Sequence, residues 1–204
     1  MSGWWDTHVV PRLIGLACTQ PPVMQRRALV VPEARGDVLE LGAGGGANRA
    51  FYDPARVTQV TGIDPSPPLI ARAQAAPGQV PVTLVEGVAE DLPFASDRFD
   101  TVVTTFTLCS VADQARALAE ARRVLKPGGL LLFLEHGRAP DAGVQRWQAR
   151  LEPLWKRLAG GCHLTRPVTA AVEAAGFRVA RRDQGYMARS PRVLGWTEWG
   201  IATR

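Results

Sequence analysis

The stretch that decides the fold is Val38-Leu39-Glu40-Leu41-Gly42-Ala43-Gly44-Gly45-Gly46, residues 38–46. Its first part is a short apolar strand, and its second part is a glycine cluster that ends the strand. Glycine lets the backbone turn sharply and approach a ligand more closely than a side chain would permit. Such a turn could equally hold a dinucleotide pyrophosphate, but the spacing here is GxGxG rather than GxGxxG. No lysine follows, which argues against a phosphate-binding P-loop.

Working outward from this turn, strands and helices alternate along the chain. We predict strands at 37–41, 57–63, 80–85, 99–106, 130–135, 177–181 and 193–203, and helices at 67–76, 112–125 and 167–175. This alternation is typical of an α/β fold: a Rossmann-like, doubly wound, mainly parallel seven-stranded sheet. Ligands of such sheets bind at the carboxyl ends of the strands. We therefore expect the chemistry of the protein at that edge.

The length fits one domain, which we assign to residues 1–204. Residues 1–35 predict a short helical cap at the N-terminus, and residues 137–166 predict a lid-like insertion after the fifth strand. The insertion carries Trp147 and Trp155. These side chains could form an apolar wall for a small uncharged acceptor, or they could be the buried stripe of an amphipathic helix. Both interpretations can hold.

The composition is that of a soluble globular protein, with 46% hydrophobic and 21% charged residues. The net charge is +5, but the arginines are spread along the chain, so no nucleic-acid partner is expected. The apolar run 13–18 is far too short to cross a membrane. Peripheral membrane contact through Trp4 and Trp5 stays open.

The cysteines are few and far apart in the sequence: Cys18, Cys109 and Cys162. This number and spacing predict neither a disulfide framework nor a metal site. A reducing, cytoplasmic location fits best. The sequence does not indicate an oligomeric state.

Asp64 is the second informative position, because it ends the next predicted strand, 18 residues beyond Gly46. An acidic residue at that place can accept hydrogen bonds from both hydroxyls of a ribose. Asp64 and Pro65 would also begin the following helix well, so Asp64 could be a helix N-cap instead. One carboxylate could serve both roles.

Taken together, five segments in order resemble the motifs of class I S-adenosylmethionine-dependent methyltransferases. The segments are Val38 to Gly46, Val60-Thr61-Gly62-Ile63-Asp64, Gly87-Val88-Ala89-Glu90-Asp91-Leu92-Pro93-Phe94, Phe99-Asp100-Thr101-Val102-Val103 and Arg123-Val124-Leu125-Lys126-Pro127-Gly128-Gly129. The resemblance covers residues 36–135 and implies S-adenosylmethionine as cofactor.

The resemblance also implies roles for individual residues. Those implied to bind the cofactor are Glu40, Gly42, Ala43, Gly44, Asp64, Pro65, Ala89, Glu90 and Thr105. Glu40 would hold the glycine loop through its amides, and Asp64 would bind the ribose. The backbone of Ala89 would face the adenine, with Glu90 near its amino group, and the Thr105 carbonyl would face the ammonium group. Val88 stands where many relatives have an acidic residue.

The acceptor of the methyl group should lie beyond the fourth and fifth strands. His136 ends the fifth strand and is the candidate general base, because imidazole titrates near neutral pH. Alternatively, His136 supports the strand end through a backbone hydrogen bond. Since a sulfonium methyl group is already activated, alignment alone could suffice.

Later segments resemble the alkyl-thiol methyltransferases. They are Gly46 to Tyr52, Thr107 to Val111, Phe133 to His136 and Gly161-Cys162-His163-Leu164-Thr165-Arg166. The expected reaction is methyl transfer to a small nucleophile, with a thiol as one acceptor. The alternatives are N-methylation of an amine or phospholipid headgroup, and a module that binds S-adenosylmethionine without catalysis.

Overall fold

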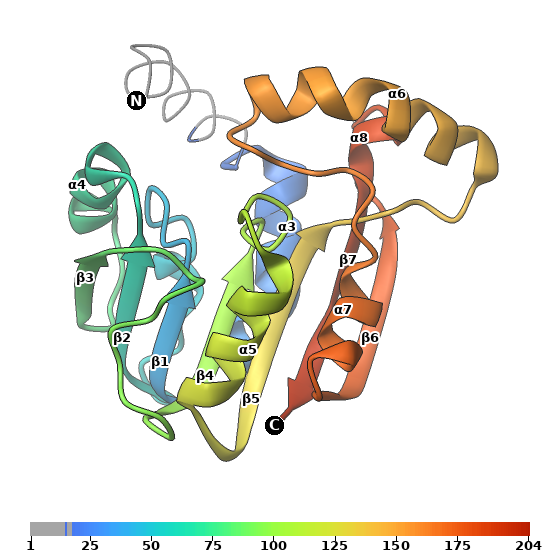
Figure 1. Cartoon of the computed structure of the whole chain (residues 1–204). Coiled ribbons are helices and arrows are strands. Elements are labelled where there is room, and N and C mark those ends of the chain that lie inside the picture. The colour runs from blue at the N-terminus through green and yellow to red at the C-terminus, as the bar shows by residue number, and fades with distance from the viewer. Residues whose placement is uncertain (1–14, 16–17) are drawn as a thin grey trace.

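One seven-stranded sheet organises the computed structural model, which describes residue 15 and residues 18–204 (Figure 1). The strand order is β3-β2-β1-β4-β5-β7-β6. The strands are β1 (Gly36–Leu41), β2 (Val57–Asp64), β3 (Val82–Glu86), β4 (Phe99–Thr105), β5 (Leu125–His136), β6 (Arg178–Tyr186) and β7 (Trp196–Thr203). All neighbours pair in parallel except β7, which is antiparallel to both β5 and β6. The predicted mainly parallel, doubly wound sheet is confirmed.

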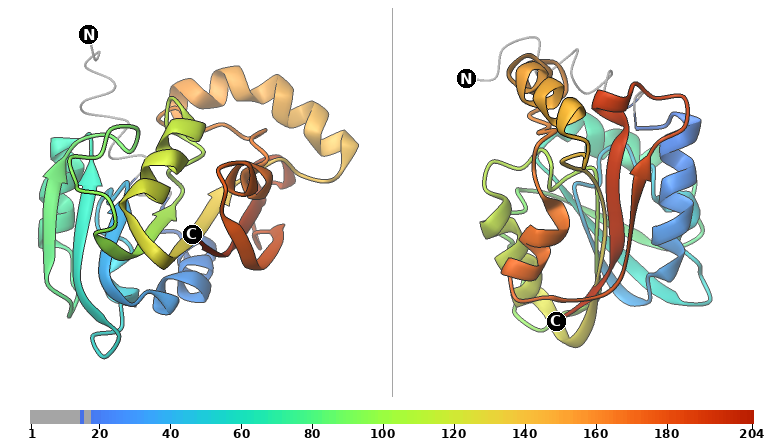
Figure 2. Two further views of the ribbon diagram at one scale, coloured as in Figure 1. Left: turned by 60° about the horizontal axis from the view of Figure 1, so that its bottom comes forward. Right: turned by 90° about the vertical axis from the view of Figure 1, so that its right-hand side faces the viewer.

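Helices cover both faces of the sheet (Figure 2). The α-helices are α3 (Pro21–Val30), α4 (Pro67–Ala75), α5 (Gln114–Val124), α6 (Ala142–Leu158), α7 (Val168–Ala174) and α8 (Arg192–Gly195), and two 3₁₀ turns are η1 (Val31–Glu33) and η2 (Arg49–Phe51). Helix α3 lies on one face, and α5 and α7 lie on the other. The central strands are apolar because both of their faces are buried.

Helix α6 crosses above the edge where the parallel strands end (Figure 1). It occupies most of the predicted insertion 137–166 and contacts α8. Trp147 of α6 is 57% exposed, so the interpretation that places both tryptophans in a buried stripe is wrong for Trp147. Trp155 is half-buried, and its indole N–H is buried without a partner among the described residues. Whether α6 acts as a lid stays a prediction.

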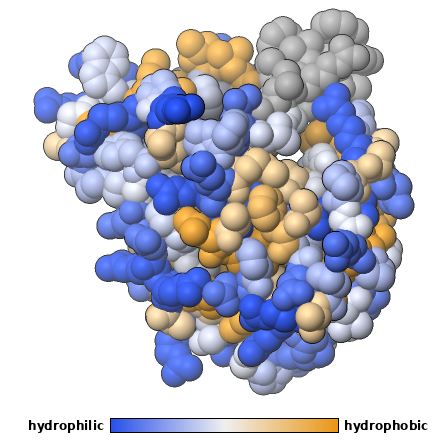
Figure 3. Space-filling view, turned by 180° about the vertical axis from the view of Figure 1, so that it is seen from behind, coloured by the Kyte–Doolittle hydropathy of each residue, from blue (hydrophilic) through white to orange (hydrophobic). Residues whose placement is uncertain are grey.

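The face of the molecule on which α3 packs carries apolar side chains at its centre, surrounded by hydrophilic ones (Figure 3). Leu29 of α3 is 50% exposed there. The helix begins at Pro21 and Pro22, where the missing N–H groups cost nothing, rather than being interrupted by them. The rest of the predicted cap, with Trp4 and Trp5, lies outside the described residues.

The largest differences between predicted and observed boundaries are at β5, β7 and β6. Residues 126–129 read as a proline and glycine stop, yet β5 already begins at Leu125, which pairs with Phe99 before regular pairing resumes at Leu130. The last strand begins at Trp196 because residues 192–195 form α8. Strand β6 continues to Tyr186, since it pairs with β7 along its length. Among the described residues, no helix is long and apolar enough to span a membrane.

Candidate functional site

The glycine loop joins the end of β1 to η2 and combines two kinds of glycine. Gly42 and Gly46 have positive φ, and a Cβ atom on either would collide with a neighbour, Thr107 for the first and Ala76 for the second. Packing within the protein therefore requires both. Gly44 also has positive φ (53°), but a Cβ there would find its nearest neighbour, the Gly42 carbonyl oxygen, at 3.8 Å. None of the described residues fills the space above Gly44, which a ligand could therefore occupy.

Asp64 lies beside this loop at the end of β2 and is only 6% exposed. Its Oδ2 accepts a hydrogen bond from the Gly44 N–H at 2.8 Å, and its Oδ1 accepts one from the Ser66 N–H at 2.9 Å. Burial raises the pKa of Asp64, while these two bonds favour the charged form. Anchoring of the loop is thus observed, whereas the predicted N-cap role of Asp64 is wrong, because the N-cap residue of α4 is Ser66. Ribose binding stays a prediction, with lone pairs of the carboxylate left to serve it.

A buried polar network lies beneath the loop. Glu40 accepts hydrogen bonds from Asn48 Nδ2 and from the Tyr52 hydroxyl, both at 2.8 Å. The Arg27 guanidinium donates to Asn48 Oδ1 at 2.7 Å and to the Thr105 hydroxyl. Burial raises the pKa of Glu40 to about 7. Among the described residues, the hydrogen bonds of Glu40 go to these side chains, and the predicted bonds to the loop amides are not observed.

Arg27 was missed by the sequence analysis, although it reaches the network from α3 in the predicted cap. It is 4% exposed, and its Nε is buried with no partner among the described residues. A buried arginine of this kind places positive charge beneath the glycine loop, near Glu40 and the end of β4. Only its position on the inward face of the short α3 could have signalled it.

The predicted adenine loop lies between β3 and β4. Ala89 is buried and packs in the core cluster with Leu92. Glu90 Oε1 accepts the backbone N–H groups of Ala112 and Asp113 at 2.8 and 3.2 Å, just before α5. Its carboxylate therefore fixes this loop to the entry of α5. The adenine contacts of this loop stay predictions. The cofactor contacts of Ala43 and Pro65, and the orientation of the Thr105 carbonyl toward the cofactor, stay predictions too.

On the acceptor side, Glu135 holds the loop that follows β4. It is fully buried and accepts hydrogen bonds from the Thr104 hydroxyl at 2.8 Å, the Thr107 N–H at 3.1 Å and the Cys109 N–H at 3.2 Å. Burial raises its pKa. Phe106, inside this loop, has a φ of 57°, a strained value for a bulky residue. Strain held by surrounding bonds is typical of functional loops.

The segment after α6 is bound to this loop. The His163 N–H donates to the Cys109 carbonyl at 2.7 Å, and the Arg166 guanidinium donates to the carbonyls of Leu108 and Val111. Glu152 of α6 orders the same segment, because its carboxylate accepts from residues 163–165. Residues 107–111 and 159–166 therefore form one rigid unit.

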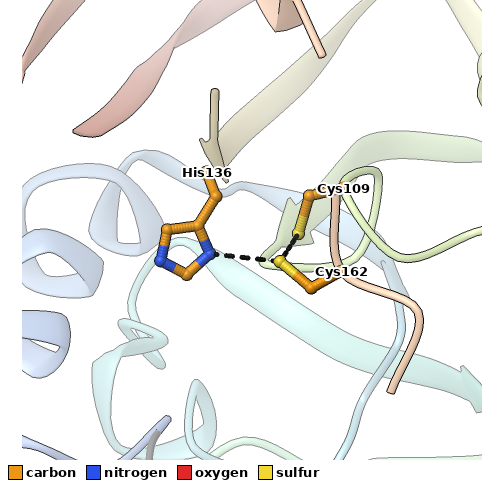
Figure 4. Close-up of side chains that lie close together, drawn as sticks. All are labelled: Cys109, His136 and Cys162. Atoms are coloured by element: carbon orange, nitrogen blue, oxygen red, sulfur yellow. Dashed lines mark hydrogen bonds between the residues drawn. The ribbon is translucent and has the colours of Figure 1, made fainter. Parts of the chain in front are cut away.

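These contacts bring together Cys109, His136 and Cys162 (Figure 4). Cys162 Sγ lies 3.5 Å from Cys109 Sγ and 3.6 Å from His136 Nδ1. The hydrogen bond from the Cys109 thiol, helped by the neighbouring His136, lowers the pKa of Cys162 to about 4 against the effect of burial. The His136 ring also packs on Phe106, with centroids 4.8 Å apart. The role of His136 as a general base stays a prediction. Its Nδ1 atom faces the sulfur of Cys162 rather than a backbone group.

Gly161 sets the close approach of the two loops, and we expect Gly161→Ala to destabilise the protein. Its φ is 85°, and a Cβ atom would lie 3.0 Å from the Ser110 carbonyl oxygen. The left-handed conformation alone costs an alanine about 1–2 kcal/mol. The matched control is Gly143→Ala in the first turn of α6, where a Cβ meets nothing within 4 Å among the described residues and should stabilise the helix by less than the ~0.5–1 kcal/mol of a mid-helix position. Urea unfolding of both variants measures this, and changes of equal sign would contradict it.

Comparison with known protein families and curated proteins gives consistent results. A family described as a methyltransferase domain matches residues 39–133. Human thiol S-methyltransferase TMT1B is 36% identical over 182 residues, covering 86% of this chain and 72% of that protein. Rat thiol S-methyltransferase TMT1B is 40% identical over 146 residues, covering 69% of this chain and 59% of that protein. The chain thus spans about three fifths of the rat relative.

Solved structures share the fold at lower identity. A Haloferax volcanii methyltransferase, solved in complex with the Trm112 methyltransferase activator, superposes with a TM-score of 0.73 at 20% identity, covering 98% of this chain and 95% of its own. An S-adenosylmethionine-dependent methyltransferase from Thermotoga maritima gives a TM-score of 0.67 at 21% identity, covering 97% and 98%. At these identities, the two similarities show a shared fold alone.

Proposed function

This chain belongs to the family of S-adenosylmethionine-dependent methyltransferases, and from that premise we propose that it methylates the sulfur of a small thiol. The observation that carries the proposal is the similarity to human thiol S-methyltransferase TMT1B. A match over 86% of a 204-residue chain necessarily includes residues 30–175. It therefore spans the glycine loop and Asp64, and also the two loops on the acceptor side.

The residues present fit the cofactor. Gly44 leaves open space beside the Asp64 carboxylate, and a ribose needs an approachable backbone and a charged acceptor at that position. When bound, S-adenosylmethionine supplies a methyl group activated by its sulfonium. The hydrogen bonds that join Arg27, Asn48 and Glu40 lie beneath the glycine loop and hold its shape before the cofactor binds.

On the acceptor side, the chain supplies alignment and exclusion of water. Glu135 fixes the loop 107–109, and Arg166 closes the segment after α6 over it. In the overall reaction a carbon–sulfur bond forms to the acceptor as the carbon–sulfur bond of the sulfonium breaks. The products are a methyl thioether, S-adenosylhomocysteine and the proton of the thiol.

The proposal is tested by incubating the protein with methyl-labelled S-adenosylmethionine and matched acceptors. Each alkyl or aryl thiol is paired with the amine and the alcohol or phenol of the same carbon skeleton, and a phospholipid amine is included. We expect label in methyl thioethers and a preference for thiols over their amine partners. Transfer to amines alone would overturn the thiol assignment. If the protein bound the cofactor but transferred its methyl group to none of the acceptors, it would be a binding module rather than an enzyme.

A further inference from the structure

Three potential metal ligands from three separate segments converge on the acceptor side. The Sγ atoms of Cys109 and Cys162 and one ring nitrogen of His136 all lie within 4.8 Å of one another. Cys109 follows β4, His136 ends β5, and Cys162 follows α6 (Figure 4). Two soft sulfur donors with one imidazole nitrogen form a donor set that suits zinc and disfavours magnesium or calcium.

Two of the three spacings between these atoms are close to the edges of a zinc tetrahedron. With usual Zn–S and Zn–N bond lengths, two sulfur ligands lie roughly 3.8 Å apart, and a sulfur and a nitrogen ligand roughly 3.6 Å apart. The two sulfur atoms are separated by 3.5 Å, and Cys162 Sγ and His136 Nδ1 by 3.6 Å. The third pair, Cys109 Sγ and the His136 ring nitrogen, lies within 4.8 Å, so these two atoms would have to approach each other by up to about 1 Å to admit the ion.

The ligands are held in place by groups that are independent of any metal. Glu135 accepts the Cys109 N–H, the His163 N–H donates to the Cys109 carbonyl, and the His136 ring is packed against Phe106. Outer contacts of this kind orient metal ligands and are part of functioning metal sites.

We propose that Cys109, His136 and Cys162 form a binding site for a thiophilic divalent cation, with Zn²⁺ as the best match. On binding, the thiols lose their S–H protons to solvent, and His136 coordinates as neutral imidazole through Nδ1. Three protein ligands leave a fourth position open, which is the arrangement of catalytic zinc. An acceptor sulfur would be a suitable fourth ligand, a consequence that rests on the thiol transfer proposed above.

A disulfide between Cys109 and Cys162 is the competing outcome. Both cysteines are free, and a separation of 3.5 Å is a non-bonded contact. Forming the bond would remove two electrons and two protons and would consume both metal ligands. If the protein is kept reduced throughout, the disulfide does not form and both thiols stay available to a metal ion, so the two outcomes can be told apart.

The test is titration of the full-length, reduced protein with Co²⁺, followed by competition with Zn²⁺. We expect one equivalent to bind, with the intense visible bands of tetrahedral Co²⁺ and a sulfur-to-metal charge-transfer band. Cys109→Ser, Cys162→Ser and His136→Gln should each weaken binding by more than the ~10- to 100-fold that loss of an outer partner of a ligand costs. Cys18→Ser is a further comparison: Cys18 is not one of the three ligands, although it lies near enough to Cys162 for the two to interact electrostatically, and its loss should leave the tetrahedral bands in place.

Thermal unfolding and S-adenosylmethionine binding establish that each variant is folded, and Cys162→Ala replaces Cys162→Ser if the latter is not. The absence of stoichiometric metal in the reduced wild type would overturn the proposal. Tetrahedral bands that persist in all three ligand variants would overturn it too, as would an intact-mass measurement showing a Cys109–Cys162 disulfide under reducing conditions. None of these readouts requires methyl transfer, so failure of the proposed function would not imitate them.

Discussion

We expect Gly44→Val to abolish S-adenosylmethionine binding while the protein still folds. In the free protein the new side chain has room, because a Cβ at Gly44 meets its nearest neighbour only at 3.8 Å. The side chain therefore occupies the space that the cofactor needs. Overpacking a contact costs about 1–3 kcal/mol, occasionally more, and a cost at the upper end of that range lowers the affinity by roughly a hundredfold or beyond detection. Isothermal titration calorimetry of wild type and variant measures the change.

The variant also carries backbone strain, since Gly44 has a φ of 53°. Gly128→Val is the matched control, because Gly128 also has a positive φ (73°) and, among the described residues, nothing within 4 Å of a Cβ. Gly128 lies near the start of β5, far from the carboxyl ends of the strands where the glycine loop lies. Both variants should lose similar stability, and only Gly44→Val should lose the cofactor. If Gly44→Val binds within tenfold of wild type, the loop does not hold the cofactor as assigned.

Much of the fold could be predicted because local signals agree with the tertiary arrangement. The stretch from Val38 to Gly46 combines an apolar strand with a turn, and Asp64 ends the next strand as predicted. Boundaries failed where pairing decided the outcome. Leu125 joins β5 because Phe99 of β4 is beside it, and nothing in Lys126-Pro127-Gly128-Gly129 indicates that partner.

The site was predicted only in part, because sequence patterns report neighbours along the chain. Arg27 and Thr105 are 78 residues apart, yet they share a hydrogen bond beneath the loop. Likewise, Cys109 and Cys162 are separated by 53 residues and lie in contact. Cysteine spacing predicted no metal site, since ligands from three segments leave no local motif. The cytoplasmic location stays a prediction.

Asp64→Ala should weaken S-adenosylmethionine binding by roughly ten- to a hundredfold, because hydrogen bonds to a charged acceptor are each worth ~1.5–3 kcal/mol. The structure adds a second cause. The same carboxylate accepts the Gly44 N–H, so its loss also loosens the glycine loop. Calorimetry on the folded variant gives the total effect, and unchanged affinity would remove Asp64 from the site.

The two causes separate when the ligand is changed together with the protein. A cofactor analogue without ribose hydroxyls should bind the wild type more weakly, but it should bind Asp64→Ala no more weakly than the natural cofactor does. The coupling measures the direct contact, since loosening of the loop affects both ligands alike. Asp64→Asn provides a further control, because its amide oxygen can still accept the Gly44 or the Ser66 N–H while the charge is lost. If Asp64 only anchors the loop, the coupling is zero and asparagine restores affinity. If it binds the ribose, the coupling persists and asparagine restores only the part that loop order contributes.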